Sequence, residues 1–149
     1  MARSQTINEE IRLEVYRLLG AAKKAGESGD IATSTQLANE AWSHIPEPKF
    51  GWDVTYVCIG AMVKLLRRCG QHDQAMAIVN GYLQSPYYLD YQDGPHFWLG
   101  TLQYEKGDLA AAYQHFERAN RMSRGRCFVE EDSKYKGFFK MFKTSGKPN

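Results

Sequence analysis

The sequence predicts an all-α protein in which three helical hairpins form a short solenoid that is closed by a C-terminal capping helix. Apolar residues recur at helical spacing along the chain, and no stretch alternates as a strand would. Glycines interrupt this spacing at Gly29, Gly70 and Gly107, at intervals of 41 and 37 residues. We therefore expect a single repeat domain at 1–143, with hairpins at about 7–45, 52–85 and 94–122, a capping helix at 132–142 and a frayed tail at 144–149.

The first hairpin is predicted from its caps and its terminating prolines. Thr6 and Glu9 have the spacing of a capping box, and Asp30 follows Gly29 as an N-cap for the second helix. Pro46 and Pro48 end that helix, because proline cannot continue it. The apolar stripe of the first helix is Ile11, Val15, Leu18, Leu19 and Ala22.

The second hairpin begins with a strongly apolar helix from Trp52 to Cys69. Gly70 supplies the turn, and we expect Asp73 to cap the following helix, whose apolar face holds Ala75, Ile78, Val79 and Tyr82.

The third hairpin has the clearest pattern. A Leu99-Gly100 pair is followed by a turn at Gly107-Asp108 and then by Ala112, Phe116 and Ala119. Small residues stand where two antiparallel helices must approach each other, and Phe116 is expected to fill the space between them.

This spacing of Leu-Gly, an aromatic residue, a turn glycine and then Ala, Phe and Ala resembles the tetratricopeptide repeat, a helix-turn-helix unit of about 34 residues. The third hairpin departs from that pattern at His96, Gln103 and Arg124. The first two hairpins match it more loosely, and both connections between hairpins exceed the length of a strict array.

The C-terminal segment is predicted to cap the array. Arg124-Gly125-Arg126 breaks the third hairpin, and Asp132 or Ser133 then caps a short helix through Tyr135, Phe138, Phe139 and Phe142. A repeat array needs such a helix, because its last repeat would otherwise expose an apolar face.

Composition and charge describe an ordinary globular chain. The net charge of +2 conceals an asymmetry, because residues 1–117 carry 10 basic and 14 acidic side chains whereas residues 118–149 carry 9 and 3. A basic end is typical of nucleic-acid or acidic partners, but more commonly it is only solvated, and we favour the second interpretation.

Targeting signals and cysteine usage favour the cytoplasm. No apolar run approaches the length of a membrane span, so we expect no membrane partner, and the polar start has no signal-peptide core. Cys58, Cys69 and Cys127 form no CxxC pair, and we expect them to be buried free thiols in a reducing compartment.

No group of residues predicts catalysis. The four histidines have no metal-ligand spacing, the glycines form no phosphate-binding loop, and Glu130-Glu131-Asp132 is more simply a favourable arrangement of charge at a helix start. We therefore expect neither an enzyme nor a cofactor or metal site.

The resemblance to tetratricopeptide repeats implies a concave groove lined by the first helix of each hairpin. The positions that it places there are Tyr16, Leu19, Lys23, Val57, Gly60, Lys64, Arg67, Phe97, Thr101 and Tyr104. Lys64 and Arg67 would form a basic patch, while neighbouring Arg68 is better explained by the negative end of its helix. The Lys and Asn clamp that some family members use for a partner's C-terminal carboxylate is absent.

The connection Ser85–Pro95 is the second candidate for binding. It carries three tyrosines and two aspartates, which are residue types that anchor interfaces, although we expect Tyr88 to pack back on the hairpins. Together the two features predict a partner-binding surface comprising Lys64, Arg67, Tyr87, Asp90, Tyr91, Phe97, Thr101 and Tyr104.

Two further motifs narrow the resemblance. Pro46-Glu47-Pro48-Lys49 before Trp52-Asp53, and the segment from Gly125 to Phe128 followed by Glu131 to Phe138, resemble a group of small bacterial tetratricopeptide-like proteins encoded beside polymorphic toxins. That resemblance implies an immunity protein, or antitoxin, that neutralises a cognate toxin by direct binding. The alternative is an adaptor or secretion chaperone that holds an extended segment of a partner protein, and a nucleic-acid partner is the less favoured interpretation.

Overall fold

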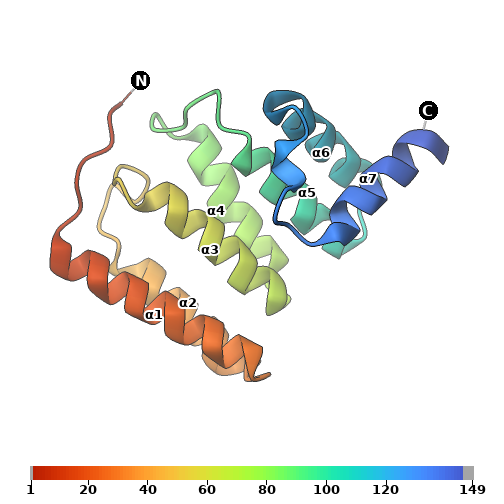
Figure 1. Ribbon diagram of the computed structural model, residues 1–149. Helices are drawn as coiled ribbons and strands as arrows, with labels where there is room; N and C mark the ends of the chain where they lie inside the picture. Colours follow the sequence, from red (N-terminus) through yellow and green to blue (C-terminus); the bar gives the residue numbers. More distant parts are fainter. Residues whose placement is uncertain (1, 146–149) are drawn as a thin grey trace. The chain divides into compact units, whose positions relative to one another are not determined.

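The computed structural model describes residues 2–145, with side chains to residue 143, and this part of the chain folds into seven α-helices and one short 3-10 helix. It divides into two compact units, Met1–Tyr88 and Leu89–Asn149, each of which is described here by itself (Figure 1). The predicted all-α class is confirmed, whereas the tetratricopeptide-like solenoid and the single continuous domain stay predictions. Among the described residues, no helix has the length and apolar character needed to cross a bilayer.

Unit 1 begins with an extended segment that leads into the first hairpin, α1 (Glu9–Glu27) and α2 (Ile31–His44). The predicted capping box at Thr6 is wrong. Asn8 is the N-cap of α1, and its Oδ1 accepts hydrogen bonds from the backbone N of Glu10 at 2.9 Å and of Ile11 at 3.3 Å. The residues before Asn8 cannot join the helix because Gln5 pairs through its backbone with Gly51 and Asp53.

The hairpin turns follow the sequence pattern. Gly29, Gly70 and Gly107 have φ angles of +85°, +75° and +87°, in the left-handed region that only glycine adopts without strain. Asp30 and Asp108 then cap the second helices of their hairpins, since their Oδ1 atoms accept from Thr33 N at 3.1 Å and Ala111 N at 3.2 Å. The three predicted turns at Gly29, Gly70 and Gly107 are confirmed, as is the predicted cap at Asp30.

The second hairpin of unit 1 comprises α3 (Thr55–Arg68) and α4 (His72–Gln84). The expected cap at Asp73 is wrong, because α4 begins at His72 and Gln71 stands at the N-cap with no side-chain cap hydrogen bond. Asp73 lies instead in the first turn, where its charge is favourable to the helix dipole.

A cluster of aliphatic and small side chains joins α1, α2 and the start of α3 in unit 1. Its buried members are Ile7, Val15, Leu18, Ala41, Ile45, Val54 and Cys58. Ser34 is also buried, and its hydroxyl donates to the carbonyl of Ala22 at 2.8 Å, which joins α2 to α1.

Unit 2 contains the third hairpin, α5 (Gly94–Lys106) and α6 (Leu109–Ser123), followed by η1 (Arg126–Phe128) and α7 (Ser133–Ser145). Phe116 is fully buried against Gly100, where an added Cβ would lie only 2.6 Å from its ring. The expectation that Phe116 fills the space between the two helices is therefore confirmed. After Ser123 the left-handed Arg124 and Gly125 end α6.

α7 lies against the hairpin of unit 2 and closes its aromatic core (Figure 1). Asp132 Oδ1 accepts from Lys134 N at 3.0 Å, as expected for the cap of this helix. Tyr135 donates its hydroxyl to Glu105 Oε1 at 2.9 Å, and Lys134 makes an ion pair with the same oxygen at 2.7 Å. The helix runs to Ser145 rather than 142, and residues 146–149 of the predicted frayed tail lie outside the described residues.

Candidate protein-binding site

The structure divides the predicted binding residues into three groups. Lys64, Asp90 and Tyr91 are exposed, and Tyr91 has 72% of its surface accessible. Arg67, Tyr87 and Tyr104 are half-buried, whereas Phe97 and Thr101 are buried.

The prediction that Phe97 and Thr101 lie on an open surface is wrong. The Phe97 ring packs against the rings of Phe116 at 5.4 Å, Phe128 at 5.5 Å and Tyr135 at 6.2 Å. Tyr104, which the same prediction placed in the groove, packs against Tyr135 at 5.5 Å. The physical reason is that η1 and α7 fold back onto α5 and bury the face that an uncapped hairpin would leave open.

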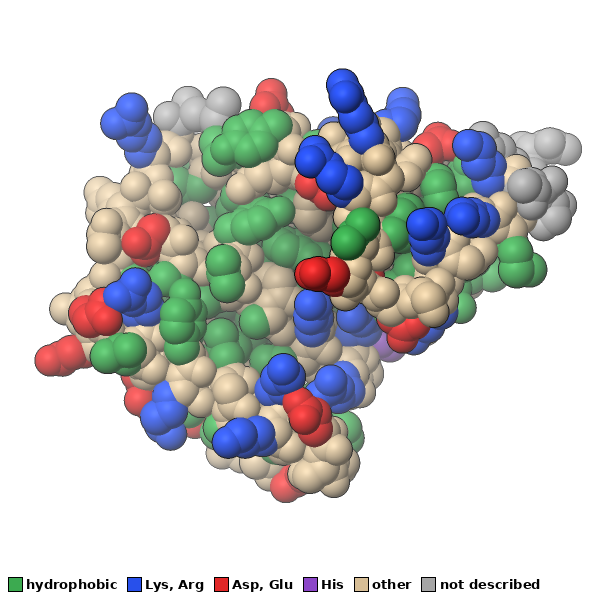
Figure 2. Space-filling model, in the orientation of Figure 1, with side chains coloured by type: hydrophobic (Ala, Val, Ile, Leu, Met, Phe, Trp, Pro, Cys, Tyr) green, Lys and Arg blue, Asp and Glu red, His purple; other side chains and the backbone are tan. Residues whose placement is uncertain are grey.

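The face of unit 1 formed by the first helices remains open. Leu13 and Tyr16 on α1 are 59% and 43% exposed, and Val57 on α3 is 63% exposed. Figure 2 shows hydrophobic side chains between these two helices and Lys and Arg side chains where both helices end. This face is therefore accessible, as the resemblance implied for Tyr16, Val57 and Lys64.

Arg68 lies against the end of a neighbouring helix rather than against the end of its own helix, where its sequence context had placed it. A Cβ built on Gly26, at the last turn of α1, would lie 3.2 Å from Arg68 Nη1, so the guanidinium lies against the negative end of that helix. Arg68 thus has a structural role between α3 and α1.

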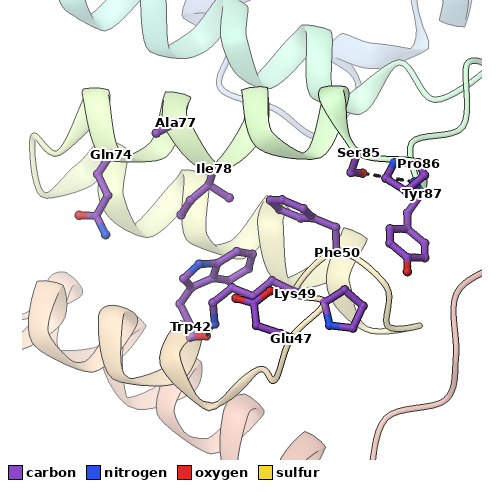
Figure 3. Close-up of a pocket in the computed structure, with 11 residues that line it drawn as sticks. Trp42, Glu47, Lys49, Phe50, Gln74, Ala77, Ile78, Ser85, Pro86 and Tyr87 are labelled. Atoms are coloured by element: carbon purple, nitrogen blue, oxygen red, sulfur yellow. Dashed lines mark hydrogen bonds between the residues drawn. The ribbon is translucent and has the colours of Figure 1, made fainter.

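A pocket of about 520 Å³ opens between α2 and α4 of unit 1 (Figure 3). Trp42 comes from the last turn of α2, and Gln74, Ala77 and Ile78 come from α4. The connecting segments on either side complete the wall with Glu47, Pro48, Lys49, Phe50, Ser85, Pro86 and Tyr87.

Two glycines allow the aromatic rings to reach this pocket. A Cβ at Gly81 would lie 3.0 Å from the Phe50 ring, and a Cβ at Gly51 would lie 2.9 Å from the Tyr87 ring. Phe50 can therefore lie on α4, 6.2 Å from the Trp42 ring and 5.9 Å from the Tyr82 ring. Trp42, Phe50 and Tyr87 thus form an aromatic wall of the pocket.

Lys49 lies within this aromatic wall, and its Nζ is hydrogen-bonded to the backbone of the protein. Its Nζ donates to the carbonyl oxygens of Trp42 at 2.7 Å and Ile45 at 2.8 Å, and it stands 5.4 Å from the centre of the Trp42 ring. Burial lowers the pKa of Lys49, although the charge of Glu47 opposes this shift. Lys49 therefore caps the end of α2, where a cation is favourable.

The lining of the pocket is largely apolar and aromatic. The polar groups in its wall are largely engaged, since Gln74 bonds to Asn39 and Ser85 donates to the Tyr82 carbonyl at 2.7 Å. A pocket with apolar walls and a few polar groups at its rim is the usual form of a binding site.

Sequence reasoning found Tyr87 but missed Trp42 and Phe50. The available signal was the pair of aromatic residues on either side of Pro46-Glu47-Pro48, because a proline-rich turn brings its two ends together. That turn was interpreted as a helix terminator and as part of a family motif, so its aromatic neighbours were overlooked as pocket residues.

No group of three or more His, Cys, Asp and Glu side chains in the described part of the chain could hold a metal ion. Comparison with known proteins adds no identity, because no family model, curated protein or solved structure matches the chain. The site is therefore interpreted from its own residues.

Proposed function

We propose that this chain is a protein-binding module that acts in the cytoplasm as an immunity protein and neutralises a bacterial toxin by binding it directly. The pocket between α2 and α4 carries the proposal that it binds a protein. The resemblance of the Pro46–Lys49 and C-terminal motifs to toxin-associated proteins supports the choice of a toxin as the partner.

The pocket has the features of a receptor for an anchoring side chain of a partner. Its volume of about 520 Å³ accommodates one or two large side chains, and Trp42, Phe50 and Tyr87 provide apolar contact area around them. Binding energy in protein interfaces is concentrated in a few such anchors. Glu47 at the exposed rim would select for a partner residue beside the anchor that can donate a hydrogen bond or carry positive charge.

The exposed residues predicted from the sequence extend the proposal. Lys64 on α3 and Asp90 and Tyr91 after α4 are accessible to a partner, and a charged or aromatic contact from each would add specificity. Immunity needs no reaction in this protein, only a tight surface that covers the toxin's active site or its target-binding site.

The proposal requires that a neighbouring gene encode a toxin domain, and the test is protection against that domain. Cells that express that domain should survive when this protein is co-expressed, and Ala77→Trp should abolish survival because the indole would fill the pocket from exposed α4. Asn80→Trp places the same side chain on an exposed position of α4 outside the pocket and should still protect. Equal protection by both variants would remove the pocket from the proposal.

The alternative function is an adaptor or secretion chaperone that holds an extended segment of a partner. It would be favoured if wild-type protein protects against no toxin and instead binds several secreted proteins, with binding lost in Ala77→Trp and retained in Asn80→Trp.

A further inference from the structure

The extended segment that precedes α1, residues 2–7, is bonded to the connection between α2 and α3, beside which it runs in Figure 1. Gln5 N donates to the carbonyl of Gly51 at 2.8 Å, and Gln5 O accepts from Asp53 N at 2.8 Å. Ile7 N donates to Asp53 Oδ1 at 3.1 Å, and the Ile7 side chain is buried in the core of unit 1. We call residues 2–7 the N-terminal clasp.

The other end of the clasp reaches the connection that follows α4. Ala2 N donates to the carbonyl of Pro86 at 3.1 Å. Pro86 and its neighbour Tyr87 line the pocket between α2 and α4, and the Tyr87 ring lies against Gly51, where an added Cβ would be 2.9 Å away. The clasp therefore bonds to both of the connections that complete the pocket wall, at the place where these connections touch each other.

The bonds at the two ends of the clasp involve its backbone rather than its side chains. Arg3, Ser4 and Gln5 are exposed, and the bonds at residues 2 and 5 join backbone groups only. An isolated pairing of this kind buries little apolar area and is marginally stable in water. The clasp is therefore a support of the pocket that can be released while the helices of unit 1 stay folded.

Bonds within each connection shape that connection but do not join it to the other one. Gly51 N donates to the carbonyl of Pro48 at 2.9 Å, and Tyr87 N donates to Ser85 Oγ at 3.3 Å. The clasp adds hydrogen bonds from one segment to both connections. Releasing the clasp should therefore loosen the position of one connection against the other, which is the contact that brings the Tyr87 ring to the pocket.

We propose that the N-terminal clasp regulates the pocket between α2 and α4, because the docked clasp holds the aromatic wall in its binding form and the released clasp lets that wall open. This inference rests on the binding function proposed above for the pocket. Coupling between two sites is reciprocal. A molecule that binds the wall should therefore stabilise the docked clasp, and a partner that captures residues 2–5 should weaken binding in the pocket.

The experiment compares the wild-type chain with a variant that lacks residues 2–5. The deletion removes the backbone bonds at both ends of the clasp but retains Ile7 in the core and Asn8 at the N-cap of α1. Amide exchange followed by NMR should be at least tenfold faster at Gly51 and Tyr87, whose acceptors lie within their own connections and are not deleted. Amides in the middle of α2 should exchange as in wild type, which shows that the variant is folded.

Binding is measured by NMR titration with N-acetyltryptophanamide, a mimic of an aromatic anchor, and is followed through the signals of Ile78 in the pocket wall. The deletion should weaken this binding at least fivefold. In wild type, a saturating amount of the probe should slow the exchange of Asp53 N, which donates to the clasp. The matched control is the triple variant Arg3→Ala, Ser4→Ala and Gln5→Ala, which keeps the backbone of the clasp and should behave as wild type in each measurement.

A second variant, Gln5→Pro, keeps the length of the chain and removes only the donor to Gly51, so it should change exchange and affinity in the same direction as the deletion. The proposal is overturned if exchange at Gly51 and Tyr87 is unchanged in both variants. It is also overturned if exchange rises while affinity for the probe stays the same, or if the triple alanine variant loses as much affinity as the deletion. If wild type does not bind the probe, the proposed anchoring function fails and the regulatory role fails with it, whereas the exchange rates still measure the hold of the clasp separately.

Discussion

The two units of this protein build their cores from different side chains. Unit 1 has two hairpins, and its cluster around α1 and α2 consists of aliphatic and small residues such as Val15, Leu18 and Ala41. Unit 2 has one hairpin and a capping helix, and its core is dominated by aromatic rings, among them Phe97, Phe116 and Tyr135.

The difference shows how a single hairpin can be closed. Two hairpins provide enough helical surface for aliphatic side chains to bury one another, whereas one hairpin does not. A large ring buries about 150–250 Å², so a few of them can compensate for the missing helices. Tyr135, Phe138 and Phe139 supply that area from α7, which makes the capping helix part of the core of unit 2.

The largest predicted effect is on the aromatic core. Phe116→Ala should destabilise unit 2 by about 3–5 kcal/mol, because Phe116 is fully buried among Phe97, Phe128 and Tyr135. Hydrogen exchange should show loss of protection in α5, α6 and α7, measured amide by amide. Leu18→Ala in unit 1 should cost about 2–4 kcal/mol and expose α1 and α2 first. Equal loss of protection across both units from either change would contradict the separation of the two cores.

A smaller effect is expected at the contact between α5 and α6. Gly100→Ala should destabilise unit 2 by about 1–3 kcal/mol although alanine is the better helix former, because its Cβ would stand 2.6 Å from the buried Phe116 ring. Gly137→Ala on α7 should have the opposite sign and stabilise by about 0.5–1 kcal/mol. Urea denaturation of the two variants measures both values, and two changes of the same sign would refute this packing argument.

The sequence predicted the hairpins better than it predicted their surfaces. Turn glycines and N-cap aspartates act locally, so Gly107 and Asp108 could be placed from spacing alone. The burial of Phe97 depends on where α7 packs after α6 ends at Arg124 and Gly125. No local sequence pattern specifies the direction that the chain takes after those residues. The predicted binding face on α5 is therefore covered by α7, although the sequence had predicted α7 itself correctly.

The candidate site shows the same limit. Tyr87 was recognised as an interface residue from the composition of its segment, but Trp42 is 45 residues away in the sequence and meets it only because α2 and α4 enclose one pocket. Gly51 and Gly81, which let Tyr87 and Phe50 approach, could not be recognised without knowing which rings lie against them.

The stability of unit 2 should depend on pH because it contains a buried histidine, His96. Burial, together with the nearby Arg118 and His115, lowers the pKa of His96 to about 4, against about 6.5 in the unfolded chain. The unfolded state therefore binds more protons between these values, so stability is complete above about pH 6.5 and falls by about 3 kcal/mol as the pH drops to 4. Urea denaturation from pH 7 to 4.5 should show a smaller decrease for His96→Gln than for wild type, and an identical decrease would exclude this origin.

The smallest effects compare equivalent caps in the two units. Asp30→Ala and Asp108→Ala remove the same type of hydrogen bond, to Thr33 N and Ala111 N, so each should cost about 1 kcal/mol. Asn8→Ala should cost a similar amount, whereas Thr6→Ala should change stability little, because Asn8 caps α1. Denaturation midpoints of the four variants test this, with hydrogen exchange locating each loss in its own unit. A larger loss for Thr6→Ala than for Asn8→Ala would restore the capping box that the sequence suggested. Near-equal losses of stability for Asp30→Ala and Asp108→Ala would show that the two units use the same turn chemistry although their cores consist of different side chains.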